Sequence, residues 1–338
     1  MRILLVKTSS LGDVVHTFPA LTDAQRALPG VTFDWVVEEA FADIVVQHPA
    51  VNRVIPCALR RWRKSLWRTW RSGEWKGFKA TLQAQQYDLV LDAQGLAKSA
   101  FITRLGTGPK AGFDKQSARE PVSARVLDRP LAIARGQHAI TRLRQLFATA
   151  LGYGFEDSAP DYGIARNAAS GSRRLIFFHG TTWPTKHWPE HYWGELARLA
   201  TQDGYQVMLP WGNEAERQRA DRIAAGNEKV SVLPAMRLGE LFSLLREVQG
   251  FVAVDTGLAH LAAGAGVPGI ALYGPTDPVL TGVLGRHARS LAADFPCAPC
   301  VQERCSYRGE LGRGIEPPCF STLPPARVWQ ALEQVCVS

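Results

Sequence analysis

The chain of 338 residues contains no apolar run that approaches the roughly twenty residues of a membrane-spanning helix. It also lacks a pattern typical of a secretory signal, because a strand pattern follows Arg2 directly. From these two absences we expect a cytoplasmic protein. The length is sufficient for two domains with their own cores, and 46% hydrophobic and 21% charged residues are typical of soluble globular proteins.

Three common ligand-binding signatures are also absent, namely GxGxxG, GxxxxGK(S/T) and Asp-x-Asp. Their absence argues against a typical NAD site, a P-loop NTPase and an enzyme that holds a sugar nucleotide through a carboxylate-bound divalent metal. We therefore expect a protein that works without a cofactor.

Acidic residues are in deficit, because 31 Asp and Glu face 39 Lys and Arg and leave a net charge of +8. Such an excess indicates an anionic partner. It is concentrated in the basic stretch 60–79, where Glu74 is the only acidic residue and several tryptophans are interspersed. This stretch is interpreted either as a solvated cationic helix packed by its tryptophans or as an interfacial element that binds anionic lipid headgroups. No recognised nucleic-acid-binding module accompanies it, so nucleic acid is not expected as a partner.

Strand and helix patterns alternate through both halves of the sequence. Short apolar runs separated by amphipathic segments predict parallel strands connected by helices. The predicted strands cover residues 2–6, 31–37, 53–56, 88–91, 175–178, 206–210, 230–233, 251–254 and 269–273. Two such series predict an α/β protein with two doubly wound, Rossmann-like domains that face a central cleft, where ligands bind at the carboxyl ends of the strands.

The domain boundaries are predicted from a loss of periodicity. Residues 156–173 are rich in Ser, Ala, Pro, Asp and Gly and are the best linker candidate. We therefore assign residues 1–165 to the first domain and 166–323 to the second. The amphipathic segment 324–338 is expected to form a helix that packs back on the first domain.

Asp13 is the candidate catalytic base of the first domain. It ends the loop KTSSLGD at 7–13, which follows the first predicted strand and offers three hydroxyl side chains. A carboxylate at that position could accept the proton of a nucleophilic hydroxyl. Its place in the first turn of a helix should lower its pKa, so that proton removal would be late. The alternative is that Asp13 only stabilises the helix dipole.

Residues 251–278 are predicted to form the centre of the second domain's site. A buried strand ends at Asp255, and a helix of small residues follows Gly257. Free backbone N–H groups and the positive end of the helix dipole favour an anion there. Thr256 and His260 favour a site for a phosphorylated ligand, although Asp255 could merely cap the helix of an ordinary βαβ unit.

Two further loops of the second half supply candidates for the same site. In residues 179–188, Thr181 and Thr182 can donate hydrogen bonds to phosphate oxygens, and Lys186 can neutralise a phosphate charge. In residues 211–216, the carboxylate of Glu216 suits a ribose diol. A threonine-rich loop with one lysine is common, but its position after a buried strand favours the functional interpretation.

Four cysteines lie close together in the sequence near the C-terminus. Their spacing is compatible with a zinc or iron–sulfur centre, and disulfides are not expected in a reducing cytosol. No neighbouring motif calls for metal chemistry, so we expect no catalytic metal and retain a structural metal clip as the alternative. The four residues are Cys297, Cys300, Cys305 and Cys319.

Six segments carry a resemblance to a known family. They are KTSSLGDVVHTFPAL at 7–21, RRWRK at 60–64, DAQGLAKSA at 92–100, KHWP at 186–189, DTGLAHLAA at 255–263 and YGPTDP at 273–278. Together they resemble the bacterial lipopolysaccharide heptosyltransferases of glycosyltransferase family 9, and most of all those that add the first heptose. The resemblance runs over nearly the whole chain.

The resemblance implies a GT-B fold, ADP-L-glycero-β-D-manno-heptose as donor and the Kdo of Kdo2-lipid A as acceptor. It also implies inversion without a metal, lipopolysaccharide inner-core biosynthesis, and a peripheral location on the cytoplasmic face of the inner membrane. Matched residue by residue, it makes Asp13 the general base and Lys186 the ligand of the leaving diphosphate.

The remaining site residues implied by the resemblance fall into two groups. The donor-binding residues are Thr181, Thr182, Lys186, Glu216, Met236 in the adenine pocket, Asp255, Thr256, Gly257 and His260. The acceptor-binding residues are Ser10, Gly12, Arg60, Arg61, Arg63 and Arg119.

Other functions stay open at this point. The cysteine segment, residues 297–319, is more typical of enzymes that add the second heptose. A sugar-nucleotide epimerase could share the two-domain fold. A non-catalytic protein that binds anionic lipid or nucleic acid would explain the charge, but it would leave the loops around Asp13, Lys186 and Asp255 without a role.

Overall fold

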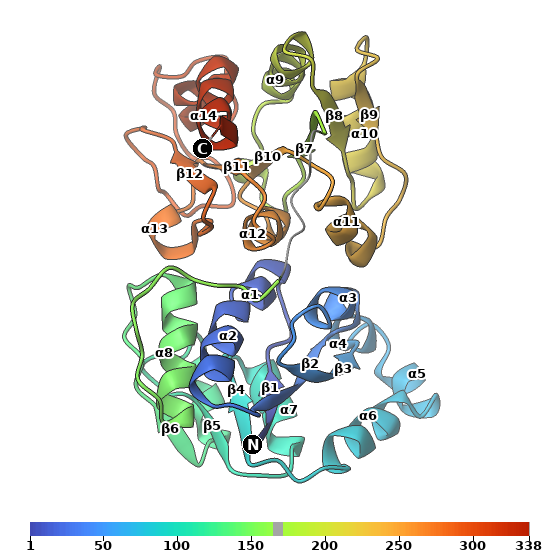
Figure 1. Cartoon of the computed structure of the whole chain (residues 1–338), viewed down its shortest axis with the longest axis vertical. Helices are drawn as coiled ribbons and strands as arrows, with labels where there is room; N and C mark the ends of the chain where they lie inside the picture. Colours follow the sequence, from blue (N-terminus) through green and yellow to red (C-terminus); the bar gives the residue numbers. More distant parts are fainter. Residues whose placement is uncertain (165–171, 338) are drawn as a thin grey trace. The chain divides into compact units, whose positions relative to one another are not determined.

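A computed structural model describes residues 1–164 and 172–337 of the chain (Figure 1). The chain divides into two compact units, Met1–Ile164 and Ala165–Ser338, and the predicted boundary after residue 165 lies one residue from this division. Residues 165–171, in the middle of the predicted linker, lie outside the described residues. Its flanks at 156–164 and 172–173 contain no helix or strand.

The first unit is built on a parallel sheet with the strand order β3-β2-β1-β4-β5-β6. Its strands are β1 (Arg2–Val6), β2 (Thr32–Glu38), β3 (Val51–Cys57), β4 (Leu89–Asp92), β5 (Lys110–Phe113) and β6 (Arg129–Leu131). Its α-helices are α1 (Leu11–Val15), α2 (Phe18–Ala27), α3 (Ala42–Val45), α4 (Leu59–Trp62), α5 (Leu66–Arg71), α6 (Glu74–Gln83), α7 (Ala97–Leu105) and α8 (Ala139–Leu151). The direction in which strands are added reverses between β1 and β4, and ligands of doubly wound sheets bind at such a switch point.

Helices cover both faces of this sheet, and α2 and α8 lie side by side (Figure 1). On one face, Leu4 and Val6 share a buried core with Phe78 of α6. On the other face, the ring of Phe33 lies 5.8 Å from that of Phe147 in α8. Strands that are buried on both faces need apolar residues at successive positions, which explains the continuous apolar runs in the sequence.

The second unit repeats this architecture with the strand order β12-β11-β10-β7-β8-β9, again all parallel. Its strands are β7 (Arg174–Phe178), β8 (Gln206–Leu209), β9 (Val230–Val232), β10 (Gly250–Val254), β11 (Gly269–Tyr273) and β12 (Ala288–Ala292). Its α-helices are α9 (Glu190–Gln202), α10 (Glu214–Ala224), α11 (Leu238–Leu244), α12 (Gly257–Gly264), α13 (Pro278–Thr281) and α14 (Pro325–Val337). The switch point lies between β7 and β10. The predicted pair of doubly wound parallel-sheet domains is therefore confirmed.

The C-terminal helix α14 packs inside the second unit, against α9, β10 and β11. Val328, Leu332 and Val335 are buried in the core of that unit, and the indole of Trp329 donates to Asp203 at 3.2 Å. The apolar face of the helix is therefore covered within the second unit, and packing of residues 324–338 on the first domain stays a prediction. In the described part of the chain, no helix combines the length and apolar content that crossing a bilayer requires.

Local structure differs from the prediction in two respects. The single helix expected near residues 13–28 is divided into α1 and α2, and Pro19 is the second residue of α2, where a missing N–H costs no hydrogen bond. Strands β5, β6 and β12 were not predicted. They are short and contain Gly112, Pro130 and polar residues, and β6 and β12 are edge strands, so their sequences lack an apolar run.

Candidate functional site

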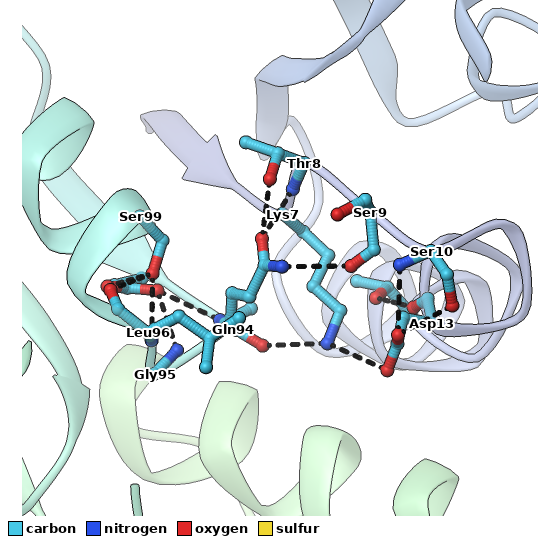
Figure 2. A network of polar contacts seen from close by, with 12 residues as sticks. Lys7, Thr8, Ser9, Ser10, Asp13, Gln94, Gly95, Leu96 and Ser99 are labelled. Atoms are coloured by element: carbon cyan, nitrogen blue, oxygen red, sulfur yellow. Dashed lines mark hydrogen bonds and ion pairs between the residues drawn. The ribbon is translucent and has the colours of Figure 1, made fainter. Parts of the chain in front are cut away.

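Asp13 lies in the first turn of α1, just after the loop that leaves β1 (Figure 2). Its Oδ2 accepts hydrogen bonds from the backbone N–H and the hydroxyl of Ser10, both at 2.9 Å. Its Oδ1 lies 3.6 Å from the ammonium of Lys7, which also donates to the carbonyl of Ala93 at 3.1 Å. These contacts orient the carboxylate while 44% of the Asp13 side chain stays exposed, so a substrate hydroxyl can reach it.

The surroundings of Asp13 favour its ionised form. Burial alone would raise the pKa of this carboxyl, but the Lys7 ammonium, the two hydrogen bonds from Ser10 and the charge of Arg119 together hold the pKa below its usual value. The predicted lowering is confirmed, and Lys7, Ser10 and Arg119 contribute to it. A carboxylate with a low pKa is a weak base, so it suits a reaction in which the proton is removed late.

A second loop, which follows β4, is tied to the loop after β1 (Figure 2). The side-chain oxygen of Gln94 accepts hydrogen bonds from the N–H and the hydroxyl of Thr8, each at 2.8 Å, and its amide donates to the Ser9 carbonyl at 2.9 Å. The ammonium of Lys98 donates to the Ser9 hydroxyl at 2.7 Å. Since β1 and β4 are neighbours where the strand order reverses, these two loops meet at the switch point of the first unit.

These loops line a cavity of about 300 Å³ within the first unit. Four cationic side chains and one carboxylate contribute to its lining: Lys7, Lys98, Arg119, Arg142 and Asp13. A concave site with this balance of charge suits an anionic substrate. We name it the Asp13 cavity.

The Asp13 cavity contains only part of the predicted acceptor site. Ser10 and Arg119 line it together with Asp13, whereas Gly12 is buried within α1. The polar lining residues that were not predicted include Lys7, Gln94, Lys98, Ser117 and Arg142. Three of them, Lys7, Gln94 and Lys98, belong to the motifs KTSSLGD and DAQGLAKSA. These motifs could therefore have identified them as site residues.

The arginines at the start of the basic stretch make other contacts. Arg61 forms ion pairs with Glu74 at 2.8 Å and with Glu39 at 3.2 Å. The guanidinium of Arg60 lies 5.7 Å from the ring centre of Phe41, and Arg63 is exposed. None of these three arginines is among the residues that line the Asp13 cavity. The resemblance had predicted that these three arginines and Arg119 belong to one acceptor site. In the structure, only Arg119 lines the Asp13 cavity.

In the second unit, Asp255 follows the carboxyl end of β10 and is contacted from two other loops. Its Oδ2 lies 2.8 Å from the ammonium of Lys186 and accepts a hydrogen bond from the Thr276 hydroxyl at 2.7 Å. Its backbone carbonyl accepts a hydrogen bond from the Thr181 hydroxyl at 3.0 Å. Thr181 and Lys186 follow β7 and Thr276 follows β11, and these strands are the two neighbours of β10. Three predicted donor residues thus meet at the second switch point, with Thr276 as an addition.

The ion pair of Lys186 and Asp255 is shielded from water, since the two side chains are only 17% and 10% exposed. The ring centre of Trp183 lies 4.7 Å from the ammonium, a cation–π contact. Thr256 stands at the N-cap position of α12 and Gly257 opens that helix, while His260 is buried in it. A poorly hydrated cation beside a helix N-terminus is suited to bind a diphosphate.

Glu216 lies in the first turn of α10, and its Oε2 accepts a hydrogen bond from the Gly212 N–H at 2.7 Å. Its carboxylate also packs against Gly180, where an added Cβ would lie only 2.7 Å from the Glu216 Cδ. The first turn of α10 thus contacts the loop that carries Lys186 at Gly180. Thr182 is exposed in the latter loop, and Met236 is half-buried in the segment between β9 and α11.

Two histidines beside this site were not predicted to matter. His179 is fully buried, and burial, followed by the charges of Arg219 and His187, lowers its pKa to about 4. The Nδ1 of His187 lies 3.0 Å from a guanidinium nitrogen of Arg219, and burial and that charge lower its pKa to about 4 as well. Both rings are therefore neutral at pH 7. The two imidazoles of the loop between β7 and α9 were the available signal.

The cysteine segment is part of the second unit. Cys297 and Cys305 are exposed and Cys319 is buried, and all four thiols of the segment are free. Burial and the neighbouring thiols raise the pKa of Cys319 to about 12, so it carries no charge at pH 7. Across residues 1–164 and 172–337, no three His, Cys, Asp or Glu side chains are arranged to hold a metal ion. The hypothesis of a metal clip gains no support from this arrangement.

Comparison with known proteins gives a consistent result. Residues 75–310 match the model of glycosyltransferase family 9 (heptosyltransferase). The chain is 54% identical to lipopolysaccharide heptosyltransferase 1 of Pseudomonas aeruginosa, over 100% of this chain and 99% of that protein. It is 26% identical to lipopolysaccharide heptosyltransferase 2 of Escherichia coli, over 86% of this chain and 87% of that protein.

Solved structures resemble both halves of the chain. The E. coli heptosyltransferase WaaC with ADP is 44% identical, with a TM-score of 0.86 over 99% of this chain and 100% of that one. The same enzyme with ADP-2-deoxy-2-fluoro heptose gives a TM-score of 0.83 over 99% of each chain, also at 44% identity.

Proposed function

Because the chain belongs to glycosyltransferase family 9, the heptosyltransferases, we propose that it transfers L-glycero-D-manno-heptose from ADP-heptose to the Kdo of Kdo2-lipid A. The reaction inverts the anomeric centre, requires no metal, and belongs to lipopolysaccharide inner-core biosynthesis. The observation that carries the proposal is the 54% identity, over the whole chain, to a lipopolysaccharide heptosyltransferase 1. The 26% identity to a heptosyltransferase 2 disfavours the alternative that the enzyme adds the second heptose.

The second unit supplies the donor site. WaaC is described with ADP and with a fluorinated ADP-heptose, which supports a nucleotide-sugar donor. Lys186 stands where it can neutralise the leaving diphosphate, held by Asp255 at 2.8 Å. Thr181, Thr182, Thr256, Gly257 and His260 complete the loops around the diphosphate and sugar. Glu216 binds the ribose, and Met236 lies against the adenine.

The first unit supplies the acceptor site and the base. The Asp13 cavity has a strongly cationic lining, which suits the carboxylates of Kdo. Ser10 orients the Asp13 carboxylate, and Arg119 binds acceptor charge beside it. Gly12, which is buried in α1, lets the backbone approach the acceptor. Arg60, Arg61 and Arg63 bind charges of the acceptor that lie farther from the reacting hydroxyl.

The transfer is a single displacement. The Kdo hydroxyl attacks the anomeric carbon of the heptose, and Asp13 takes up the hydroxyl proton as the new C–O bond forms. The bond between the anomeric carbon and the ADP oxygen breaks at the same time, and its electron pair leaves with the diphosphate. Lys186 stabilises the charge that develops there. Attack from the face opposite the leaving group inverts the configuration.

The basic stretch supports a peripheral position on the cytoplasmic face of the inner membrane. Trp67 and Trp70 are 66% and 76% exposed, and the guanidinium of Arg71 lies 5.0 Å from the ring centre of Trp67. Exposed indoles next to cationic side chains are typical of elements that enter the headgroup region of anionic membranes. The acceptor is itself a lipid, so binding to its membrane would increase the local substrate concentration.

Turnover of the donor tests the proposed function. The purified protein is mixed with ADP-heptose in the presence or absence of Kdo2-lipid A, and ADP release and heptosylated lipid are measured. We expect release that depends on the acceptor and equals the lipid product formed. Release without acceptor would indicate a hydrolase, interconversion of the sugar nucleotide an epimerase, and no turnover a non-catalytic binding protein.

A further inference from the structure

The cysteine segment contacts the two loops that converge on Asp255, and the proposed transfer reaction assigns it no role. One contact is made by Thr185, the residue before Lys186. Its side chain is 3% exposed, and its hydroxyl donates a hydrogen bond to the carbonyl of Gln302 at 2.6 Å, with the carbonyl of Glu303 at 3.3 Å. The turn that carries Lys186 is thereby fixed to a segment more than a hundred residues farther along the chain.

The second contact lies one residue away on the same segment. The backbone N–H of Val301 donates to the carbonyl of Pro275 at 2.7 Å. Pro275 precedes Thr276, whose hydroxyl donates to the Asp255 oxygen that pairs with Lys186. Residues 301–303 therefore hold the loop after β7 and the loop after β11 at the same time.

The backbone at Val301 is strained, which points to a constraint. Its φ is 51°, in the left-handed region that a β-branched residue rarely adopts. Its side chain is 60% exposed, so burial of the valine does not compensate this strain. Strained residues persist where the surrounding structure holds them, and they cluster at functional sites. The contact that this conformation provides is the hydrogen bond to Pro275.

We propose that residues 301–303 hold the loops of the donor site in place and that Thr185 is the positioning residue that fixes Lys186 relative to Asp255. Thr185 does not touch the substrate in this account, which rests on the proposed function of Lys186 as a diphosphate ligand. A lysine side chain has many rotamers, so its ammonium meets a diphosphate correctly only if its backbone is held. Small displacements of such a group have large effects on binding and rate.

Two substitutions of Thr185 test the proposal. Thr185→Val keeps the shape and removes the hydroxyl, whereas Thr185→Ser keeps the hydroxyl. We expect Thr185→Val to raise the KM for ADP-heptose and the Kd for ADP by about threefold to tenfold, the usual effect of losing one buried hydrogen bond. The KM for Kdo2-lipid A should not change, and Thr185→Ser should restore the parent's donor values. A general folding defect would move both KM values and would not show this split.

A second pair of variants tests the other contact and covers the case in which Thr185→Val folds poorly. Val301→Pro removes the N–H and cannot adopt a positive φ, while Val301→Gly keeps the N–H and adopts it without strain. We expect a raised donor KM for Val301→Pro and parental values for Val301→Gly. Parental donor KM in folded Thr185→Val or in Val301→Pro would overturn the proposal while leaving heptosyl transfer intact. Failure of the proposed function would appear separately, as a parent protein without turnover.

Discussion

The ammonium of Lys186 lies 2.8 Å from Oδ2 of Asp255, and the hydroxyl of Thr276 donates to that same oxygen at 2.7 Å. One carboxylate oxygen thus joins the ends of three adjacent strands, β7, β10 and β11. Asp255 keeps the lysine charge at the switch point, and Thr276 prevents the carboxylate from turning away. This arrangement gives Asp255 a role beyond capping α12, because a residue that only capped the helix would not need the buried ammonium of Lys186 beside it.

Lys186→Ala should weaken ADP-heptose binding and slow transfer together. The change removes a charge-assisted contact of about 1.5–3 kcal/mol to the leaving diphosphate, or roughly tenfold to a hundredfold in Kd. Calorimetry with ADP and steady-state kinetics would measure both effects. Lys229→Ala, at an exposed lysine of the same unit, is the matched control. Binding and turnover like those of the parent would remove Lys186 from the donor site.

Chelation tests the metal-free mechanism with the unmodified enzyme. We expect EDTA to leave the rate unchanged, because the cationic side chains would balance the diphosphate charge. A rate abolished by EDTA and restored by magnesium would contradict this expectation.

Asp13→Asn should lower kcat by about two to four orders of magnitude, the usual contribution of a general base, while the Kd for ADP stays near that of the parent. Asp43→Asn is a suitable control, since Asp43 is also a first-turn acid of a short helix in the same unit but is exposed. Turnover of Asp13→Asn within threefold of the parent would exclude Asp13 as the base.

The lowered pKa of Asp13 also predicts the pH dependence of the rate. A base must be ionised to act, so activity is lost only as pH falls through its pKa in the folded protein. Despite burial, the charges of Lys7 and Arg119 and the hydrogen bonds from Ser10 hold that pKa below the usual value of an aspartate. The profile of kcat/KM between pH 5 and 8 should therefore show no acidic limb from Asp13. A limb in that range that disappears in Asp13→Asn would show that its pKa is raised.

The sequence was sufficient to predict most strands of both sheets and the loops after β1, β7 and β10, because buried parallel strands leave uninterrupted apolar runs. It was not sufficient for contacts that depend on tertiary structure. Lys7 belongs to a predicted motif, but its contact with Asp13 could not be predicted, because it depends on the conformation of the loop between them. The pairing of Arg61 with Glu39 and Glu74 joins three elements, and no local pattern indicates it. Thr185 resembles any loop threonine until Gln302 is placed beside it.

Stability should fall as the pH is lowered from 7 to 5. The pKa of His179 and that of His187 are about 4 in the folded protein, against an ordinary value of 6.5. Between these values the unfolded chain binds protons that the folded chain does not, so unfolding is favoured by about 1.4 kcal/mol per pH unit for each histidine. Thermal unfolding at a series of pH values would measure the slope.

His179→Asn should reduce that slope, although it also lowers stability at pH 7 because a buried ring is lost. His191→Asn, at an exposed histidine of α9, should leave the slope unchanged. If stability depends on pH equally in His179→Asn and in the parent, His179 does not contribute to the loss of stability at low pH.

Trp67→Ala combined with Trp70→Ala should weaken binding to vesicles that contain anionic lipid. Exposed indoles contribute by entering the headgroup region, so transfer to membrane-presented Kdo2-lipid A should slow while transfer to a deacylated acceptor in solution should not. Vesicle sedimentation and parallel kinetics would measure both. Val46→Ala, at another exposed apolar residue of the first unit, is the control. Equal loss with both acceptors would argue for a structural role of the tryptophans.

Arg119→Ala should raise the KM for Kdo2-lipid A about tenfold, because the arginine lines the Asp13 cavity and a charge-assisted contact contributes about 1.5–3 kcal/mol. Arg61→Ala should have a smaller effect, since that guanidinium already pairs with Glu39 and Glu74. The donor KM should stay flat in both variants. Raised salt should imitate these losses in part, because Arg63 and Arg119 are both exposed and such charges are screened over about 8–10 Å. If Arg119→Ala uses the lipid acceptor like the parent while Arg61→Ala does not, the basic stretch rather than the Asp13 cavity holds the acceptor.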